Sequence, residues 1–252
     1  MAPTDLLEMH MTSEYTALEQ SRSILHRVAA HVLARRRWEV TGRFGLRISP
    51  GGIATPAFGP ETESLRTAGS NLVREGGGSV AFMTMHGQSL RALAAFAGAD
   101  LQATFSCGDD TPALGDPDEP LELVGEHLNV LVEWFEIGWR VLDVVTSALP
   151  SSAAPAASQL WPEHFDIGTN IGLVRGDRVN LGCSPGDGYE AEPYLYVGPR
   201  GPARPGDASY WNAPFGALLR RSDVDWSKDA ISGGVRFMEK GIQALNSDEF
   251  AR

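Results

Sequence analysis

The chain has 252 residues, of which 42% are hydrophobic, with six tryptophans and a formal net charge of −11. This length and apolar content are sufficient for a folded core and exclude an intrinsically disordered chain. The acidic excess argues against nucleic acid and anionic membrane surfaces as partners, and no apolar run is long enough to span a bilayer. The N-terminus lacks the features of a signal peptide, so we expect a cytoplasmic protein.

The first predicted element is a helix over residues 14–37, where apolar residues recur at helical spacing. Residues 38–48 then alternate apolar and polar side chains, which predicts a half-buried strand. The turn-forming residues Ser49-Pro-Gly-Gly52 lead into a returning strand over residues 53–58.

The middle of the chain mixes strand and helix patterns. Residues 64–76 fit neither period, whereas residues 79–85 form an apolar run of strand length and residues 88–97 predict a short helix. Residues 106–120 are rich in proline and acidic side chains, which predicts a linker or a long surface loop. The longest helical pattern covers residues 121–149.

These patterns predict an α+β fold, in which mainly antiparallel sheets pack against long helices. Residues 1–105 would form an N-terminal α+β unit, 106–120 the linker or surface loop, and 121–252 a C-terminal α+β unit with the candidate site, unless the units merge into one compact domain. The stretch from Leu46 to Gly52 echoes that from Leu181 to Asp187. The echo favours two repeated helix–sheet–helix units, and the alternative is a coincidence of Ser-Pro-Gly turns.

A strand pair is predicted in the second half from alternating side chains. One face carries Phe165, Ile167 and Ile171, and the other carries His164, Asp166 and Asn170. The next apolar alternation is Val179, Leu181 and Cys183. A three-residue loop over 175–177 puts both apolar sets on one side and pairs Ile171 with Leu181.

That register places glycines beside the polar row. Asn170 lies opposite Gly182, and Asp166 lies opposite Gly186, so the row would border a shallow trough. A following strand would add two tyrosines, and an aromatic segment at 210–216 would cap the trough, form a partner-binding patch or plug the sheet edge. The candidate ligand-binding residues are therefore His164, Asp166, Asn170, Asp187, Tyr194, Tyr196, Trp211 and Asn212.

The chemistry of this set suits a polar ligand. Carboxylates and amides form directional hydrogen bonds, aromatic faces cover apolar ligand surface, and histidine titrates near neutrality. The alternative is that the polar residues are the solvated face of a surface strand and the aromatic residues belong to the core.

Neither a metal site nor a cofactor site is predicted. His164, Asp166 and Asp187 offer nitrogen and oxygen ligands, but no second histidine stands nearby, and Cys107 and Cys183 lack metal-ligand spacing. No phosphate loop, dinucleotide fingerprint or nucleophile elbow occurs. The sequence therefore identifies no cofactor, and whether the protein is an enzyme stays open.

Four segments resemble a family of actinobacterial proteins of unknown function. They are Trp161-Pro-Glu-His-Phe-Asp166, Ser184-Pro-Gly-Asp187, Glu192-Pro-Tyr-Leu-Tyr-Val197 and Tyr210-Trp-Asn-Ala-Pro-Phe-Gly216. A more distant likeness to a larger family covers most of the chain. The resemblance implies a cytoplasmic bacterial protein, and it carries no activity, so no catalytic residue follows from it.

Three functions remain open. The favoured one is the binding of a small polar molecule in the trough. The second is hydrolysis, metal-assisted or not, with His164 and Asp166 as catalytic candidates beside Asp187. The third is an interaction module that forms a homo-oligomer through the aromatic residues around Trp211 and the helix over 121–149.

Overall fold

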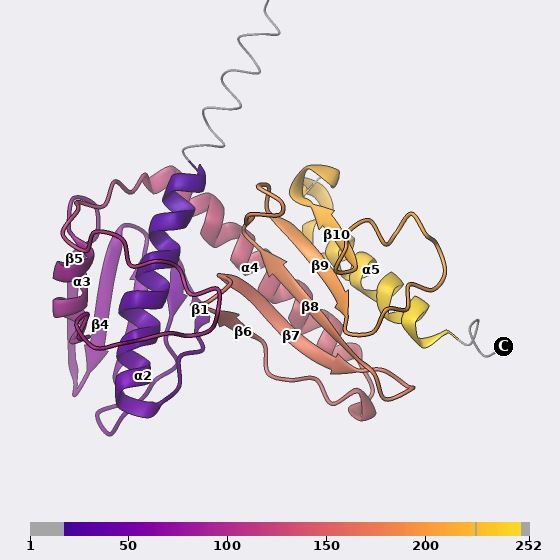
Figure 1. The fold of residues 1–252 in the computed structure, drawn as a ribbon, viewed down its shortest axis with the longest axis horizontal. Helices are drawn as coiled ribbons and strands as arrows, with labels where there is room; N and C mark the ends of the chain where they lie inside the picture. The colour runs from indigo at the N-terminus through magenta and orange to yellow at the C-terminus, as the bar shows by residue number, and fades with distance from the viewer. Residues whose placement is uncertain (1–17, 225, 248–252) are drawn as a thin grey trace, which may run out of the picture. The chain divides into compact units, whose positions relative to one another are not determined.

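The computed structural model describes residues 18–224 and 226–247 (Figure 1). They divide into two compact units. The first contains the described residues up to Glu133 together with Leu160–Phe165, and the second contains Trp134–Gln159 and the described residues from Asp166 onward. The described residues form two five-stranded antiparallel sheets, which confirms the α+β prediction. No helix in the described ranges is long and apolar enough to cross a membrane.

The boundary between the units falls inside helix α4 (Gly125–Ala148), whereas the sequence predicted it at residues 106–120. Residues 160–165 also join the first unit, although they stand far along the chain. The longest predicted helical pattern, over 121–149, does contain α4.

A long helical segment opens the first unit. Residues 18–28 are α-helical, Ala29–Ala34 form a π-helical insert (η1), and α2 (Arg35–Thr41) ends at Gly42, whose φ is +70°. The predicted start at residues 14–17 lies outside the described residues. The strand predicted from residue 38 is wrong over 38–45, because Trp38 and Val40 lie on the last, largely exposed turn of α2 and residues 42–45 belong to no strand.

The first sheet follows chain order. Its strands are β1 (Arg47–Ser49), β2 (Gly52–Ala54), β3 (Ser64–Ala68), β4 (Asn71–Gly76) and β5 (Ser79–Thr84). The predicted turn at 49–52 joins β1 to β2, the returning strand is shorter than predicted, and residues 64–76 form a hairpin. Helix α3 (Leu90–Ala97) follows, with the Ser89 hydroxyl accepting from the Ala92 N–H at its start.

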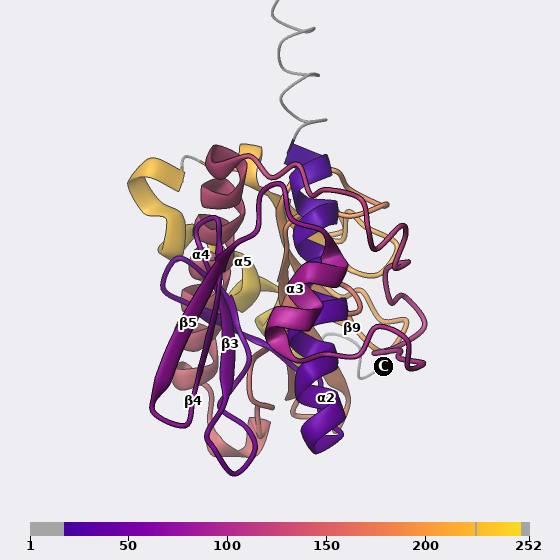
Figure 2. The same cartoon turned by 90° about the vertical axis from the view of Figure 1, so that its left-hand side faces the viewer.

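The helices of the first unit cover one face of this sheet (Figure 2). Leu65 and Leu72 point to that face and are fully buried. Arg74 shares their face and donates to the carbonyl of Phe96 in α3 at 3.3 Å. The opposite face carries Val80 and Phe82, which are exposed.

The long loop between α3 and α4 is anchored to the first helix. The Arg27 guanidinium donates to the carbonyl of Leu114 at 2.6 Å, and the His31 ring bonds the carbonyl of Pro112 at 2.7 Å. Arg35 donates to the carbonyls of Asp100 and Ala103, each at 2.7 Å. Residues 106–120 are therefore a loop packed on the first unit.

The second sheet has the order β10-β9-β8-β7-β6. Its strands are β6 (Gln159–Trp161), β7 (Asp166–Gly172), β8 (Arg178–Ser184), β9 (Tyr194–Pro199) and β10 (Ala217–Arg220), and α5 (Trp226–Asn246) follows. Helices α4 and α5 cover the apolar face (Figure 1). A Cβ at Gly138 of α4 would lie 2.3 Å from the Cys183 sulfur, and one at Gly234 of α5 would lie 2.6 Å from Leu195.

The β7–β8 register corrects the predicted one by two residues. Ile171 pairs with Val179 instead of Leu181, although the apolar side chains share one face as expected. The Leu173 N–H bonds the Asp177 carbonyl, so the three-residue loop spans 174–176. Such loops need a left-handed residue at their last position, and Gly176, with φ +89°, takes it.

The order helix, five strands, helix occurs twice along the described chain. The echoed turns nevertheless fall at different places: residues 49–52 join the first two strands of one sheet, whereas residues 184–187 follow the third strand of the other. The internal repeat is therefore not confirmed.

Candidate functional site

His164 does not lie on the predicted strand face. Residues 162–165 form a turn, and β7 begins only at Asp166. Phe165 adopts the left-handed region, with φ +59°, and stacks on His26 with ring centroids 4.9 Å apart. The alternation that sequence reasoning extended through His164 therefore starts at Asp166.

The His164 ring lies between two carboxylates of the first unit. Its Nδ1 is 3.2 Å from Asp110, and its Nε2 is 2.7 Å from Glu163. The Glu163 carboxylate rests on Gly108, where a Cβ would lie only 1.7 Å from it. His164 thus joins the anchored loop to the 160–165 segment, and the carboxylates beside it differ from the Asp166 and Asp187 that sequence reasoning gave it.

Two tyrosine–aspartate pairs line the polar face of the second sheet. The Tyr196 hydroxyl donates to Asp166, which is 8% exposed, and the Tyr194 hydroxyl donates to Asp187 at 2.5 Å. Burial and the neighbouring carboxylate raise the pKa of each phenol. Both tyrosines therefore stay protonated and act as hydrogen-bond donors at neutral pH.

The predicted trough is filled by a side chain of the same sheet. Gly168 pairs with Gly182, and Gly182 pairs in turn with Tyr196. A Cβ at Gly182 would lie 2.2 Å from the Tyr196 ring, so the ring covers the glycine. Glycine on a strand permits this close approach, which is why a row of glycines did not leave an open surface.

Asn170 has a positioning role. It lies opposite Asn180 instead of Gly182, and its amide donates to the Asn180 side chain at 2.6 Å. Arg178 donates to the Asn170 side chain through Nε and to its carbonyl through Nη2, at 2.9 Å. Asn170 therefore fixes the guanidinium of Arg178.

Trp211 and Asn212 bond to the backbone. The Trp211 indole donates to the carbonyl of Pro205 at 2.8 Å. The Asn212 amide exchanges two hydrogen bonds with the backbone of Leu218 in β10, at 2.9 and 3.0 Å. Asn212 thus plugs the outer edge of the second sheet, which is one of the three roles that the sequence left open for residues 210–216.

Phe215 is the aromatic residue of this segment that reaches the tyrosines. Its ring centroid lies 6.4 Å from those of both Tyr194 and Tyr196. Sequence reasoning singled out Trp211 and missed Phe215, although the aromatic composition of residues 210–216 was the signal for both.

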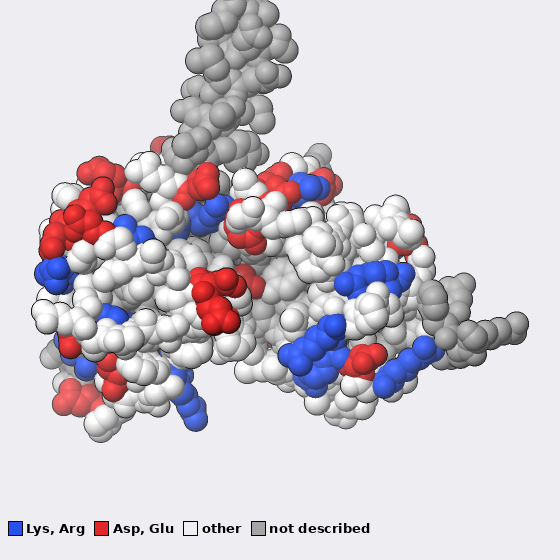
Figure 3. All heavy atoms as spheres, viewed as in Figure 1, with Lys and Arg blue, Asp and Glu red and all other residues white. Residues whose placement is uncertain are grey.

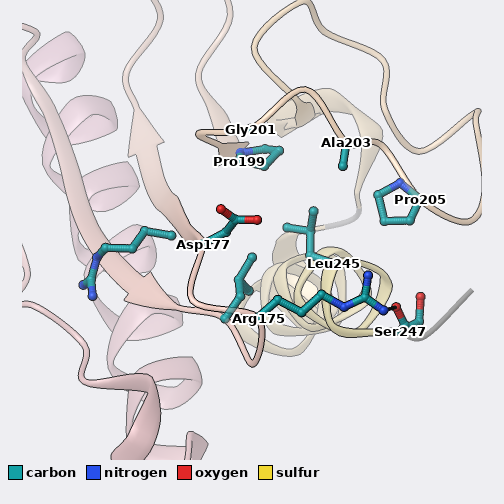
Figure 4. Close-up of a pocket in the computed structure, with 10 residues that line it drawn as sticks. Arg175, Asp177, Pro199, Gly201, Ala203, Pro205, Leu245 and Ser247 are labelled. Atoms are coloured by element: carbon teal, nitrogen blue, oxygen red, sulfur yellow. Dashed lines mark hydrogen bonds between the residues drawn. The ribbon is translucent and has the colours of Figure 1, made fainter. Parts of the chain in front are cut away.

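A cavity of about 80 Å³ lies at the end of the second sheet, where the β7–β8 turn, the end of β9 and the end of α5 meet (Figure 4). Its apolar walls are Leu173, Pro199, Pro205 and Leu245. The Asp177 carboxylate points into it. The Arg175 guanidinium lies at its rim, where it donates to the carbonyl of Ser247 at 3.2 Å.

Positive charge surrounds this cavity. Arg175 and Arg178 line it, and Arg200 and Arg204 flank Gly201 and Ala203 of its wall. Several basic side chains gather over this end of the second unit (Figure 3), in a chain whose net charge is −11. Sequence reasoning missed the cavity, because its lining comes from separate turns and a helix end, and its arginines form no run.

The described residues offer no group of three His, Cys, Asp or Glu side chains that could hold a metal ion. Cys107 and Cys183 are buried free thiols, and burial raises the pKa of both. Neither thiol therefore supplies a thiolate at neutral pH.

No family model, curated protein or solved structure matches the chain.

Proposed function

We propose that this protein binds a small polar ligand in the cavity at the end of its second sheet. The observation that carries the proposal is the placement of the Asp177 carboxylate and the Arg175 guanidinium on one small, apolar-walled cavity. A carboxylate accepts hydrogen bonds from an ammonium group, and a guanidinium donates to a carboxylate. Apolar walls with a few convergent polar groups are typical of ligand sites.

The size of the cavity limits the ligand. At roughly 10–15 Å³ for each water-sized group, 80 Å³ holds about five to eight such groups. A small α-amino acid has this size and both charges. Its ammonium group would meet Asp177, its carboxylate would meet Arg175, and its side chain would lie against Leu245.

Binding is favoured over catalysis by what surrounds the predicted catalytic residues. The hydrolase hypothesis needs His164 beside Asp166 and Asp187, whereas the carboxylates that the His164 ring contacts are those of Asp110 and Glu163. The free thiols fit a reducing, cytoplasmic setting.

Calorimetric titration of the purified chain with small amino acids tests the proposal, with the corresponding amines and carboxylic acids titrated in parallel. We expect an amino acid such as alanine or valine to bind, and the matched amine and acid to bind at least about tenfold more weakly, because each meets only one of the two charges. Asp177→Asn and Arg175→Gln should each weaken amino-acid binding to a similar extent.

Asp143→Asn and Arg140→Gln are the matched controls, because both side chains are exposed on α4 and neither lines the cavity. They should leave the affinity unchanged. The proposal is wrong if no amino acid gives a heat of binding at millimolar concentration. It is also wrong if the wild type and Asp177→Asn bind with equal affinity.

A further inference from the structure

Strand β5 is an outer strand whose free edge has none of the usual protection. It pairs with β4 along all six residues, without a bulge, and no strand among the described residues pairs with its other edge. Natural outer strands carry charges, prolines or bulges that prevent pairing with other chains. The β5 sequence Ser-Val-Ala-Phe-Met-Thr has no charged residue and no proline.

The side chains of β5 are also exposed and apolar. Val80 is 66% exposed and Phe82 is 75% exposed, and both point to the face opposite the covering helices. Phe82 lies opposite Val73 on β4, which is itself buried, so the exposed apolar side chains on this face belong to β5. An exposed apolar edge of this kind is typical of an interaction surface.

The hydrogen-bonding groups of β5 that point outward belong to alternate residues. The tight turn at Gly77 and Gly78, both with positive φ, makes Gly76 and Ser79 a hydrogen-bonded pair. The Met85 N–H, six residues on, accordingly bonds the Ser70 carbonyl. The even-numbered residues Val80, Phe82 and Thr84 therefore direct their N–H and C=O groups to the free edge.

We propose that a second copy of this chain docks on β5, with the two β5 strands paired antiparallel across a twofold axis. Two uncharged strands place no like charges opposite each other, which matters for copies that each carry a net charge of −11. Length also selects this partner: β1 and β6 have three residues each, and Asn212 occupies the free edge of β10.

The register of the dimer follows from symmetry. A twofold axis perpendicular to the sheet keeps equivalent faces together, so opposed residue numbers sum to an even value. Centring the axis on Phe82 pairs Phe82 with its own copy and Val80 with the partner's Thr84. This register engages all three outward-bonding residues of each strand. One strand per partner is a small interface, so we expect a weak dimer.

Sedimentation velocity over micromolar to millimolar concentrations tests the association. We expect a reversible monomer–dimer equilibrium for the wild type. Phe82→Lys should weaken the dimer by about tenfold or more, because it places two charges against each other at the axis. Val174→Lys is the matched control, since Val174 is 84% exposed in the β7–β8 turn, and it should dimerise like the wild type.

Oxidative cross-linking tests the register. Phe82→Cys should form a symmetric disulfide, because facing residues of an antiparallel pair lie within disulfide reach, whereas Val174→Cys should not. The native cysteines are buried and give little background. A wild type that stays monomeric throughout, a dimer unaffected by Phe82→Lys, or equal cross-linking of both variants would each overturn the proposal.

Discussion

The two sheets differ in how their outward surfaces are completed. The second sheet is closed by its own chain: Tyr196 covers Gly182 on the polar face, and Asn212 occupies the edge of β10. The first sheet leaves Val80 and Phe82 of β5 exposed. A closed surface stabilises the unit that carries it, whereas an open one gains stability only from a partner.

The largest expected effect comes from disturbing the closed face. Gly182→Ala would place a Cβ 2.2 Å from the Tyr196 ring, so the ring must move away from Asp166. We expect a loss of about 3 kcal/mol in the free energy of unfolding, measured by urea denaturation. Gly188→Ala is the control, because a Cβ there meets nothing within 4 Å. Equal stability of the two variants would show that the contact with Tyr196 is dispensable.

Acid should act on the first unit through a buried histidine. Burial lowers the pKa of His26 to about 4, so between pH 6.5 and 4 the folded state binds fewer protons than the unfolded chain does. The contribution of the neutral His26 to the free energy of unfolding is fully present above pH 6.5. It is lost as the pH falls from there through 4, by on the order of 3 kcal/mol. Denaturation at stepped pH should show this slope, and His26→Gln should flatten it. An unchanged slope in the variant would assign the acid response to other groups.

Opening the second sheet's edge should cost less. Asn212→Ala removes two hydrogen bonds to Leu218 and leaves its backbone groups unpaired, which should lower the free energy of unfolding by about 1–2 kcal/mol. Asn212→Asp keeps the acceptor for the Leu218 N–H but sets a carboxylate oxygen against the Leu218 carbonyl in place of the donor, so it should lose at least as much. Thermal denaturation measures both, and wild-type stability of either variant would contradict the edge-plugging role.

The smallest effect is expected at the open edge. Val80→Lys and Phe82→Lys should each change the free energy of unfolding of the monomer by less than about 0.5 kcal/mol, because both side chains are mostly exposed. Urea denaturation at low protein concentration measures this. A loss well beyond that value would mean that these side chains support the sheet itself.

Sequence periodicity predicted the features that depend on residues close together in the sequence. The apolar run of β5 and the shared apolar face of β7 and β8 are both present. The register failed by two residues, because the three-residue loop begins one residue earlier than predicted, which places Gly176 at its left-handed last position. The strand over 38–41 failed because two alternating apolar residues also fit the exposed end of a helix.

The candidate site was harder to predict, because it depends on what lies across the sheet. Nothing local to Gly182 tells that Tyr196 lies over it. In the sequence, Asp177 is one polar residue of a turn. The cavity beside it forms because that turn packs near Leu245 of α5. Asp166 and Tyr196 were correctly placed on one face, but their pairing with each other was not predicted.

The anchoring of the loop in the first unit has a consequence for how the protein can evolve. Arg27, His31 and Arg35 bond main-chain carbonyls, and every amino acid carries the same carbonyl. Replacement of Leu114 or Ala103 by another residue would keep those bonds, whereas an insertion or deletion between them would displace them. Amino-acid substitutions in this segment should therefore be tolerated during evolution, whereas changes in its length should not.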